Sequence, residues 1–186
     1  MTGVSYGAYI ATLMLAEKHQ NFIACGVAVS PVVDWRFYGK IGNRHIFVSC
    51  IVIPIFISPE STYTERYMGL PLPSENFRGY QKSSLIERCQ GIEGKEFFLA
   101  HGMADRNVHI QNSMILAKTL VSNNIPFEQH VKYPFILSLT LLSIQFSFQF
   151  YPDEDHFLSG VKVHLYESVT NFLGKCFAKF DPLVEE

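Results

Sequence analysis

The feature of this sequence that most constrains its fold is the pentapeptide Gly3-Val4-Ser5-Tyr6-Gly7, which stands directly before a stretch with helical periodicity. A G-x-S-x-G string in that position is typical of a sharp strand-to-helix turn that lifts a serine hydroxyl out of a sheet. Glycines are expected at both ends because larger side chains would collide in so tight a turn. The alternative is a turn of small residues that only begins a helix, and the rest of the chain decides between the two.

Apolar periodicity predicts that helices and strands alternate along the chain. Three amphipathic helices are expected. They cover residues 8–18, with Ile10, Leu13 and Met14 as apolar positions, residues 110–121, with Met114, Ala117 and Val121, and residues 161–177, with Val161, Leu165, Val169, Phe172 and Cys176. Nearly continuous apolar runs predict buried strands at residues 22–29, 97–100 and 127–131. We therefore expect an α/β protein with a mostly parallel sheet, of which about three strands are visible in the sequence.

Composition and charge exclude several classes of protein. The 186 residues suit one domain, residues 1–186, and a chain with 17% charged and 48% hydrophobic residues is not intrinsically disordered. Since 15 Lys and Arg stand against 17 Asp and Glu without a basic run, nucleic acid is not expected as a partner. The four cysteines form no C-x-x-C pair and no H-E-x-x-H string occurs, so we expect no metal and no other cofactor.

Two further side chains are available to activate an elbow serine, which needs a base oriented by an acid in the chain order Ser, Asp, His. Asp105 follows the predicted strand at 97–100, and His156 follows the third predicted strand, just before the last helix. Taken singly, Asp105 could be a helix or turn cap, and His156 could be a surface imidazole. Three such residues in this order, each at a strand end, favour a triad of Ser5, Asp105 and His156.

Five strings of residues carry a resemblance to a known family. They are Gly3 to Tyr9, Trp35 to Tyr38, Thr62 to Pro71, His101 to His109 and Tyr151 to His156, and the matches extend from residue 3 to about residue 177. They resemble the catalytic domain of the prolyl oligopeptidase family, in the branch that contains dipeptidyl peptidase IV and fibroblast activation protein. The string at residues 63–71 is specific to that branch. The resemblance implies the C-terminal portion of an α/β-hydrolase fold, starting at the nucleophile elbow, and a serine peptidase that releases Xaa-Pro dipeptides.

Carried over position by position, the resemblance implies roles for individual residues. Ser5 is expected to be the nucleophile, Asp105 the orienting acid and His156 the general base, and Tyr6 is expected to present its backbone N–H to the oxyanion. The expected substrate-binding residues are Val32, Trp35, Tyr38, Tyr63 and Val108 around an apolar proline pocket, and Asn107 at a substrate carbonyl. A disulfide between Cys25 and Cys176 is also implied, provided the compartment is oxidising.

The resemblance also implies partners and a location. The expected substrates are peptides with a penultimate proline, the expected assembly is a homodimer, and the expected location is extracellular or at the plasma membrane. Residues 1–186 show no signal peptide, and the apolar stretches at 46–57 and 135–150 are too short or too polar for a typical membrane span. Two alternatives stay open: a non-catalytic fragment or partner subunit of the same fold, and a lipase-like or esterase hydrolase, which would leave the string at 63–71 unexplained.

The chain departs from the family pattern in three ways. Inserts are expected at about residues 39–60 and 134–150, where the family has no counterpart. Our hypothesis is that they are translated introns or gene-model errors rather than evolved loops, which a cDNA read containing both in frame would refute. The chain starts at the elbow, so the strand that leads into Ser5 and a second oxyanion donor are expected to be missing. The predicted strand at 22–29 should then have an unpaired edge.

Overall fold

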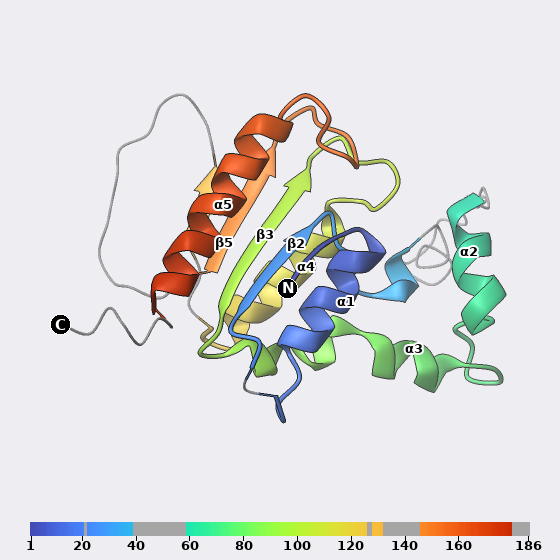
Figure 1. The fold of residues 1–186 in the computed structure, drawn as a ribbon. Helices are drawn as coiled ribbons and strands as arrows, with labels where there is room; N and C mark the ends of the chain where they lie inside the picture. Colours follow the sequence, from blue (N-terminus) through green and yellow to red (C-terminus); the bar gives the residue numbers. More distant parts are fainter. Residues whose placement is uncertain (21, 39–58, 126–127, 132–145, 180–186) are drawn as a thin grey trace.

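The computed structural model describes residues 1–20, 22–38, 59–125, 128–131 and 146–179. Within these residues, five parallel strands form one sheet in the order β1-β2-β3-β5-β4 (Figure 1). The strands are β1 (Thr2–Val4), β2 (Cys25–Val29), β3 (Glu96–Gly102), β4 (Glu128–Val131) and β5 (Phe146–Tyr151). The helices are α1 (Tyr6–Leu15), α2 (Pro59–Met68), α3 (Phe77–Ser83), α4 (Gln111–Ser122) and α5 (Lys162–Lys179), with short 3-10 turns at Trp35–Phe37, Leu85–Glu87 and Cys89–Ile92. The predicted α/β class with a parallel sheet is confirmed.

Helices cover both faces of this sheet, because successive side chains of a strand point to opposite sides. On one face, Phe97 and Leu99 of β3 and Phe148 of β5 belong to the core that includes α1 and α4. On the other face, Phe98 and Ala100 of β3 pack with α5. Figure 1 shows α5 along one side of the sheet and α1 and α4 on the other. Strands β2 and β3 are buried along their whole length, as their continuous apolar runs predict.

Two strands go beyond the three that the sequence predicts. The short β1 pairs with β2, with Thr2 opposite Val27 and Val4 opposite Val29. The expectation of an unpaired edge at the 22–29 strand is therefore wrong, since β1 occupies that edge. β5 pairs with β3 on one side and β4 on the other, so the last residues of the expected insert at 134–150 form part of the sheet. β1 is too short to show a periodic pattern, and β5, although residues 146–150 alternate between apolar and polar, lies in the stretch expected to be an insert.

All three predicted helices are present, but two of them turn a different face to the core. α1 ends at Leu15 and buries Ala8, Tyr9, Ala11, Thr12 and Leu15 rather than Ile10, Leu13 and Met14. α4 buries Asn112, Ser113, Leu116, Ala117 and Leu120 and leaves Met114 and Val121 exposed. The physical reason is that the buried polar side chains are hydrogen-bonded, which removes the cost of burying them. In α5, the predicted stripe is confirmed, with Leu165, Phe172 and Cys176 buried.

A disulfide between Cys25 and Cys176 joins β2 to α5, with 6.4 Å between the two Cα atoms. The pairing implied by the resemblance is therefore confirmed. Cys89 is buried with a free thiol, and burial raises the pKa of that thiol. Among the residues described, no helix is both long enough and apolar enough to cross a membrane.

Most of the two expected inserts lies outside the described residues. Of the range 39–60, only Pro59 and Glu60 are described, and they begin α2. Of the range 134–150, residues 146–150 are described, as β5. The apolar stretch at 46–57 and most of the stretch at 135–150 likewise fall outside the described part of the chain.

Candidate active site

The carboxyl ends of parallel strands meet along one edge of a sheet, and the residues that follow these strands supply the candidate site. Ser5 follows β1 directly and Ser30 follows β2 directly. Asp105 comes shortly after β3, and His156 shortly after β5. The topology therefore brings the three predicted triad residues to the same edge of the sheet, although they are far apart in the sequence.

Ser5 occupies a strained backbone position between β1 and α1. Its φ of 57° is a left-handed value that residues other than glycine seldom adopt. Two backbone hydrogen bonds hold it there: its N–H donates to the Val29 carbonyl at 2.9 Å, and its carbonyl accepts the Tyr9 N–H at 3.1 Å. The turn thus puts the serine at the N-terminus of α1, where the helix dipole favours negative charge.

The two glycines beside Ser5 play different parts. An added Cβ at Gly3 would lie 2.2 Å from the carbonyl oxygen of Gly7, so no larger residue fits there unless the helix moves. A Cβ at Gly7 would meet nothing within 4 Å among the described residues. The expectation that both positions exclude side chains is right for Gly3 and wrong for Gly7.

His156 and Asp105 are joined by a 2.7 Å hydrogen bond between Nδ1 and Oδ2, and both side chains are buried. Because a carboxylate can only accept, the His156 proton lies on Nδ1 and the Nε2 lone pair is left available. The other carboxylate oxygen of Asp105, Oδ1, accepts the backbone N–H groups of Asn107 and Val108 at 2.8 and 2.9 Å. Asp105 therefore orients the imidazole and is itself fixed by its own loop.

A second histidine, which the sequence reasoning did not select, also contacts Asp105. His101 Nε2 lies 3.2 Å from Oδ2 of Asp105 and 2.8 Å from the Val108 carbonyl oxygen. Burial alone would raise the pKa of Asp105, but the hydrogen bonds from His101 and His156 outweigh burial and hold that pKa well below its ordinary value. The carboxylate is thus ionised at neutral pH. The available signal in the sequence was position, since His101 stands at the end of a buried strand, four residues before Asp105.

Backbone hydrogen bonds join the loop after β3 to the loop after β5. The N–H groups of Met103 and Ala104 donate to the carbonyls of Tyr151 and Glu154, at 2.9 and 3.0 Å. Gly102 permits this approach, because an added Cβ would lie 2.4 Å from the Glu154 carbonyl oxygen. The loops that carry the acid and the base are therefore held together independently of the Asp105–His156 contact.

The Ser5 turn and the His156 loop both attach to the end of β2. The N–H of Ser5 donates to the carbonyl of Val29, and the hydroxyl of Ser30 donates to the carbonyl of His156 at 3.2 Å. The Ser5 hydroxyl makes no hydrogen bond to His156 or to any other group in the part of the chain that the structure describes. The structure thus joins acid to base directly, and brings the serine to the same strand end with its hydroxyl free to rotate.

An apolar pocket of about 510 Å³ lies beside the Ser5 turn. Its lining residues are Tyr6, Tyr9, Trp35, Tyr63, Thr64, Tyr67, Met68 and Ser83. The Trp35 ring centroid lies 5.3 Å from that of Tyr9 and 5.8 Å from that of Tyr6. The Thr64 hydroxyl is buried and finds no hydrogen-bond partner within the described ranges. The pocket can therefore hold a small apolar ring close to the serine.

The predicted substrate-binding residues divide between this pocket and the core. Trp35 and Tyr63 line the pocket, and Tyr38 packs against both, with ring centroids 5.6 and 6.2 Å away. The Tyr38 hydroxyl donates to Oδ1 of Asn107 at 3.1 Å, which links that exposed amide to the aromatic cluster. The remaining two residues lie buried in the core and do not line the pocket: Val32 and Val108.

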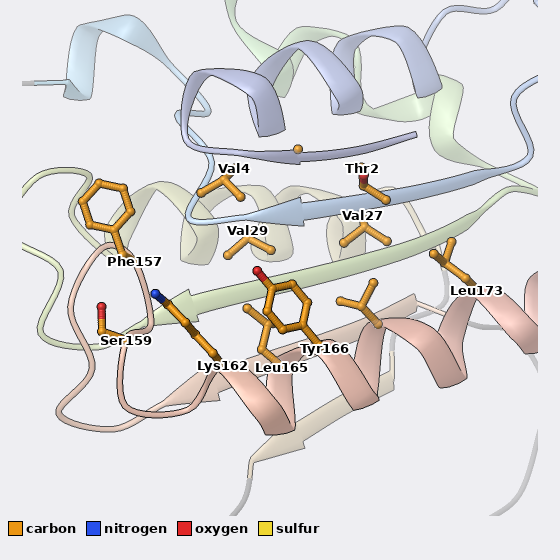
Figure 2. Close-up of a pocket in the computed structure, with 12 residues that line it drawn as sticks. Thr2, Val4, Val27, Val29, Phe157, Ser159, Lys162, Leu165, Tyr166 and Leu173 are labelled. Atoms are coloured by element: carbon orange, nitrogen blue, oxygen red, sulfur yellow. The ribbon is translucent and has the colours of Figure 1, made fainter.

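A second hollow lies on the α5 side of the sheet, between α5 and the strands β1 and β2 (Figure 2). It is lined by apolar side chains of β1, β2 and α5, among them Val4, Val27, Val29, Leu165, Tyr166 and Leu173. Phe157, whose ring lies 5.1 Å from that of His156, also lines it. The hollow adjoins the His156 loop but contains none of the three predicted triad residues.

Two acidic residues of the His156 loop accept hydrogen bonds from the backbone of that loop. Glu154 accepts the Gly160 N–H at 3.0 Å, and Asp155 accepts the Phe157 N–H at 2.9 Å. Across the residues that the structure describes, no group of three or more His, Cys, Asp or Glu side chains is arranged to hold a metal ion. These carboxylates therefore stabilise the loop that carries the base.

Comparison with known proteins identifies the family of the chain. A model of the prolyl oligopeptidase family matches residues 1–49 and 52–180. Venom dipeptidyl peptidase 4 of Vespa velutina is 36% identical over 176 residues, which are 95% of this chain and 18% of that protein. Prolyl endopeptidase FAP of Homo sapiens is 34% identical over 180 residues, which are 96% of this chain and 18% of that protein.

A solved structure shares the fold. The crystal structure of Porphyromonas gingivalis dipeptidyl peptidase 4 superposes with a TM-score of 0.65 at 30% sequence identity, over 94% of this chain and 19% of that one. The chain thus spans 18% to 19% of the length of these relatives.

Proposed function

The chain belongs to the prolyl oligopeptidase family, whose fold is that of an α/β hydrolase, and on that premise we propose that it hydrolyses peptide bonds through Ser5, Asp105 and His156. The observation that carries the proposal is the 2.7 Å hydrogen bond between Asp105 and His156, at the same sheet edge as the strained Ser5 turn. A serine hydroxyl, a base and an orienting acid are the components of acyl transfer through a covalent intermediate.

In the proposed reaction, Ser5 Oγ attacks the carbonyl carbon of the scissile bond while its proton moves to Nε2 of His156. Asp105 holds the proton of His156 on Nδ1, which leaves Nε2 free to accept, and stabilises the imidazolium that forms. The proton then passes to the leaving amine as the C–N bond breaks, which leaves an ester on Ser5. A water molecule activated by the same base hydrolyses that ester and restores the free hydroxyl.

Tyr6 is the proposed oxyanion donor. As the first residue of α1, it has a backbone N–H without an acceptor inside the helix. That N–H belongs to the residue after the nucleophile, and the dipole of α1 adds to its effect. We propose that the negative oxygen of the tetrahedral intermediate accepts this hydrogen bond.

We propose that the aromatic pocket selects proline at the residue whose carbonyl is attacked, so that Xaa-Pro dipeptides are released from peptides with a penultimate proline. A proline ring is rigid and apolar and lacks an N–H that would need a partner, so Trp35 and Tyr63 can enclose it at little cost. The names of the relatives, a dipeptidyl peptidase and a prolyl endopeptidase, support this choice. In this proposal Tyr38 completes the wall, Asn107 contacts a substrate carbonyl, and two valines support the pocket from the core: Val32 and Val108.

We further propose that the chain acts outside the cell or at the plasma membrane, as part of a homodimer. The disulfide between Cys25 and Cys176 supports the location, because such bonds persist in oxidising compartments. The description of one relative as a venom protein supports it too. Sedimentation of the chain, with and without reductant, tests the dimer.

Hydrolysis of Gly-Pro-p-nitroanilide, Gly-Ala-p-nitroanilide and p-nitrophenyl acetate by the purified chain, beside Ser5→Ala, tests the function. We expect Ser5-dependent release that favours Gly-Pro over Gly-Ala by tenfold or more, roughly what a fitted apolar pocket provides. Ester cleavage without a proline preference would favour the esterase alternative. A folded chain that cleaves none of the three would favour the non-catalytic alternative.

A further inference from the structure

We propose that His101 is a positioning residue of this site: its buried ring holds the Asp105 carboxylate in the orientation that lets His156 accept the proton of Ser5. The inference rests on the proposed function, since it assigns a part in the same proton transfer. His101 acts through Asp105 and does not touch the reacting atoms.

Both ring nitrogens of His101 are engaged. The side chain is fully buried at the end of β3, and its Nδ1 lies 2.7 Å from the hydroxyl of Ser113 on α4. Its Nε2 lies 2.8 Å from the Val108 carbonyl oxygen and 3.2 Å from Oδ2 of Asp105. Because both of those oxygens can only accept, Nε2 must carry a proton. The ring therefore donates to the Val108 carbonyl, and the same N–H lies close to Oδ2 of Asp105.

The contacts of His101 restrain the acid and its backbone together. The Val108 N–H donates to Oδ1 of Asp105, and the Val108 carbonyl accepts from His101. Oδ2 of Asp105 then faces two donors, His101 and His156. Removal of His101 would leave the Asp105–His156 contact and the two backbone hydrogen bonds to Oδ1 in place, but it would remove the donor to the Val108 carbonyl and the N–H that faces Oδ2. The alignment of Nε2 with Ser5 would loosen as a result.

His101 also affects the charge of the Asp105 carboxylate that His156 contacts. The N–H of His101, 3.2 Å from Oδ2 of Asp105, draws negative charge toward that side of the carboxylate. Without that N–H, the carboxylate would attract the imidazolium form of His156 more strongly, so the acidic limb of the pH–rate profile should move to higher pH. His101 therefore has an effect on the pH dependence of catalysis that a purely structural residue lacks.

Few other charged groups bear on this contact. Asp105 is influenced by His101 from β3 and by His156 from the loop before α5. From that loop, the Glu154 and Asp155 carboxylates bond to their own backbone. After β2 and on α4, the uncharged hydroxyls of Ser30 and Ser113 contact the His156 backbone and the His101 ring. The remaining ionisable side chains of the two loops are exposed: Arg106, His109 and Asp153.

The test compares His101→Leu, which removes the donor, with His101→Gln, which can restore a neutral donor at the position of Nε2. His109→Gln is the matched control, because His109 is exposed in the same loop and does not contact Asp105. Rates are normalised to active sites counted with a fluorophosphonate. For His101→Leu we expect kcat to fall by roughly tenfold or more with KM nearly unchanged. The acidic midpoint of the kcat/KM profile should rise by about one pH unit.

In His101→Gln we expect the midpoint and most of kcat to return, and in His109→Gln neither should move. A His101→Leu protein with an unchanged midpoint and an unchanged rate per active site would overturn the proposal. If that variant does not fold, nitrogen-15 NMR of the parent chain decides, because the proposal requires a proton on Nε2 of His101 throughout the folded range. A bare Nε2 would overturn it.

Failure of the proposed function can be distinguished from failure of the positioning role of His101. If the parent chain has no turnover, the downfield proton on Nδ1 of His156 still reports the Asp105 contact. We expect that NMR signal to shift or disappear in His101→Leu and to persist in His109→Gln. A signal that is the same in parent and His101→Leu would overturn the positioning role.

Discussion

Asp105 shows at the scale of a single residue why the site needs more than its three expected members. Its Oδ1 is fixed by two backbone N–H groups, while Oδ2 faces two imidazoles, of His101 and His156. Position at a strand end was enough to predict Asp105 and His156 from the sequence. The contact of His101 with Asp105 could not be predicted, because a histidine inside an apolar run is equally compatible with a residue that only fills the core.

The low pKa of Asp105 gives a prediction for stability. A carboxyl whose pKa is depressed in the folded state contributes stability that is fully present above its ordinary pKa of 3.8 and that is lost as the pH falls below it. Urea unfolding from pH 7 to pH 3 should therefore show the free energy of unfolding declining below about pH 4.

Asp105→Asn should flatten that decline and cost roughly 2 kcal/mol at pH 7, where the charged hydrogen bonds are lost. It should also lower kcat on the order of 10⁴-fold, because the amide no longer holds the His156 proton on Nδ1. An Asp105→Asn protein with the same acid sensitivity as the parent would show that another carboxyl controls acid unfolding.

At the scale of elements, the sequence predicts where the helices lie better than it predicts which face of each helix is buried. Helices α1, α4 and α5 are where the periodicity indicates them, but in α1 and α4 the buried stripe includes polar side chains. Thr12 donates to the Ala8 carbonyl, and Asn112 accepts the Val33 N–H, so both are buried with partners that no hydropathy pattern reveals. In α5, whose buried face is apolar throughout, the predicted stripe is correct.

The junction of β1 and α1 can be tested by a matched pair of substitutions. Gly3→Ala should destabilise the chain by roughly 1–3 kcal/mol and disturb Ser5, because the new methyl group meets the Gly7 carbonyl. Gly7→Ala should be neutral or stabilising by about 0.5–1 kcal/mol, because its methyl group meets nothing close and alanine favours a helix. Urea unfolding of both variants checks this. Equal losses of stability would mean that the turn is not as tight at Gly3 as the structure has it.

At the scale of the whole molecule, contacts between residues far apart in the sequence determine features that local sequence patterns do not reveal. The disulfide could be predicted because the resemblance to a known family implies it. The sheet order β1-β2-β3-β5-β4 could not, because β1 is three residues long and β5 lies between two strands that precede it in the sequence. The Cys25–Cys176 bond joins β2 to α5 across 151 positions of sequence and so ties the two faces of the sheet together.

Reduction of this disulfide should lower the free energy of unfolding by roughly 4–5 kcal/mol, the value expected when so long a loop is released in the unfolded chain. Urea unfolding with and without a reductant measures the difference. The double variant Cys25→Ser, Cys176→Ser is the control and should not respond to the reductant. A parent chain that is equally stable under both conditions would contradict the proposed contribution of the bond.

The central claim is that Ser5, Asp105 and His156 act as one unit. Labelling of the folded chain with a fluorophosphonate, followed by mass spectrometry of the modified peptide, tests it most directly. We expect an adduct on Ser5 in the parent chain, no adduct in Ser5→Ala, and labelling slowed by at least ~10³-fold in His156→Ala, because an unassisted serine hydroxyl is a poor nucleophile. A folded parent chain that stays unlabelled, or one that labels on Ser5 equally fast without His156, would contradict the claim.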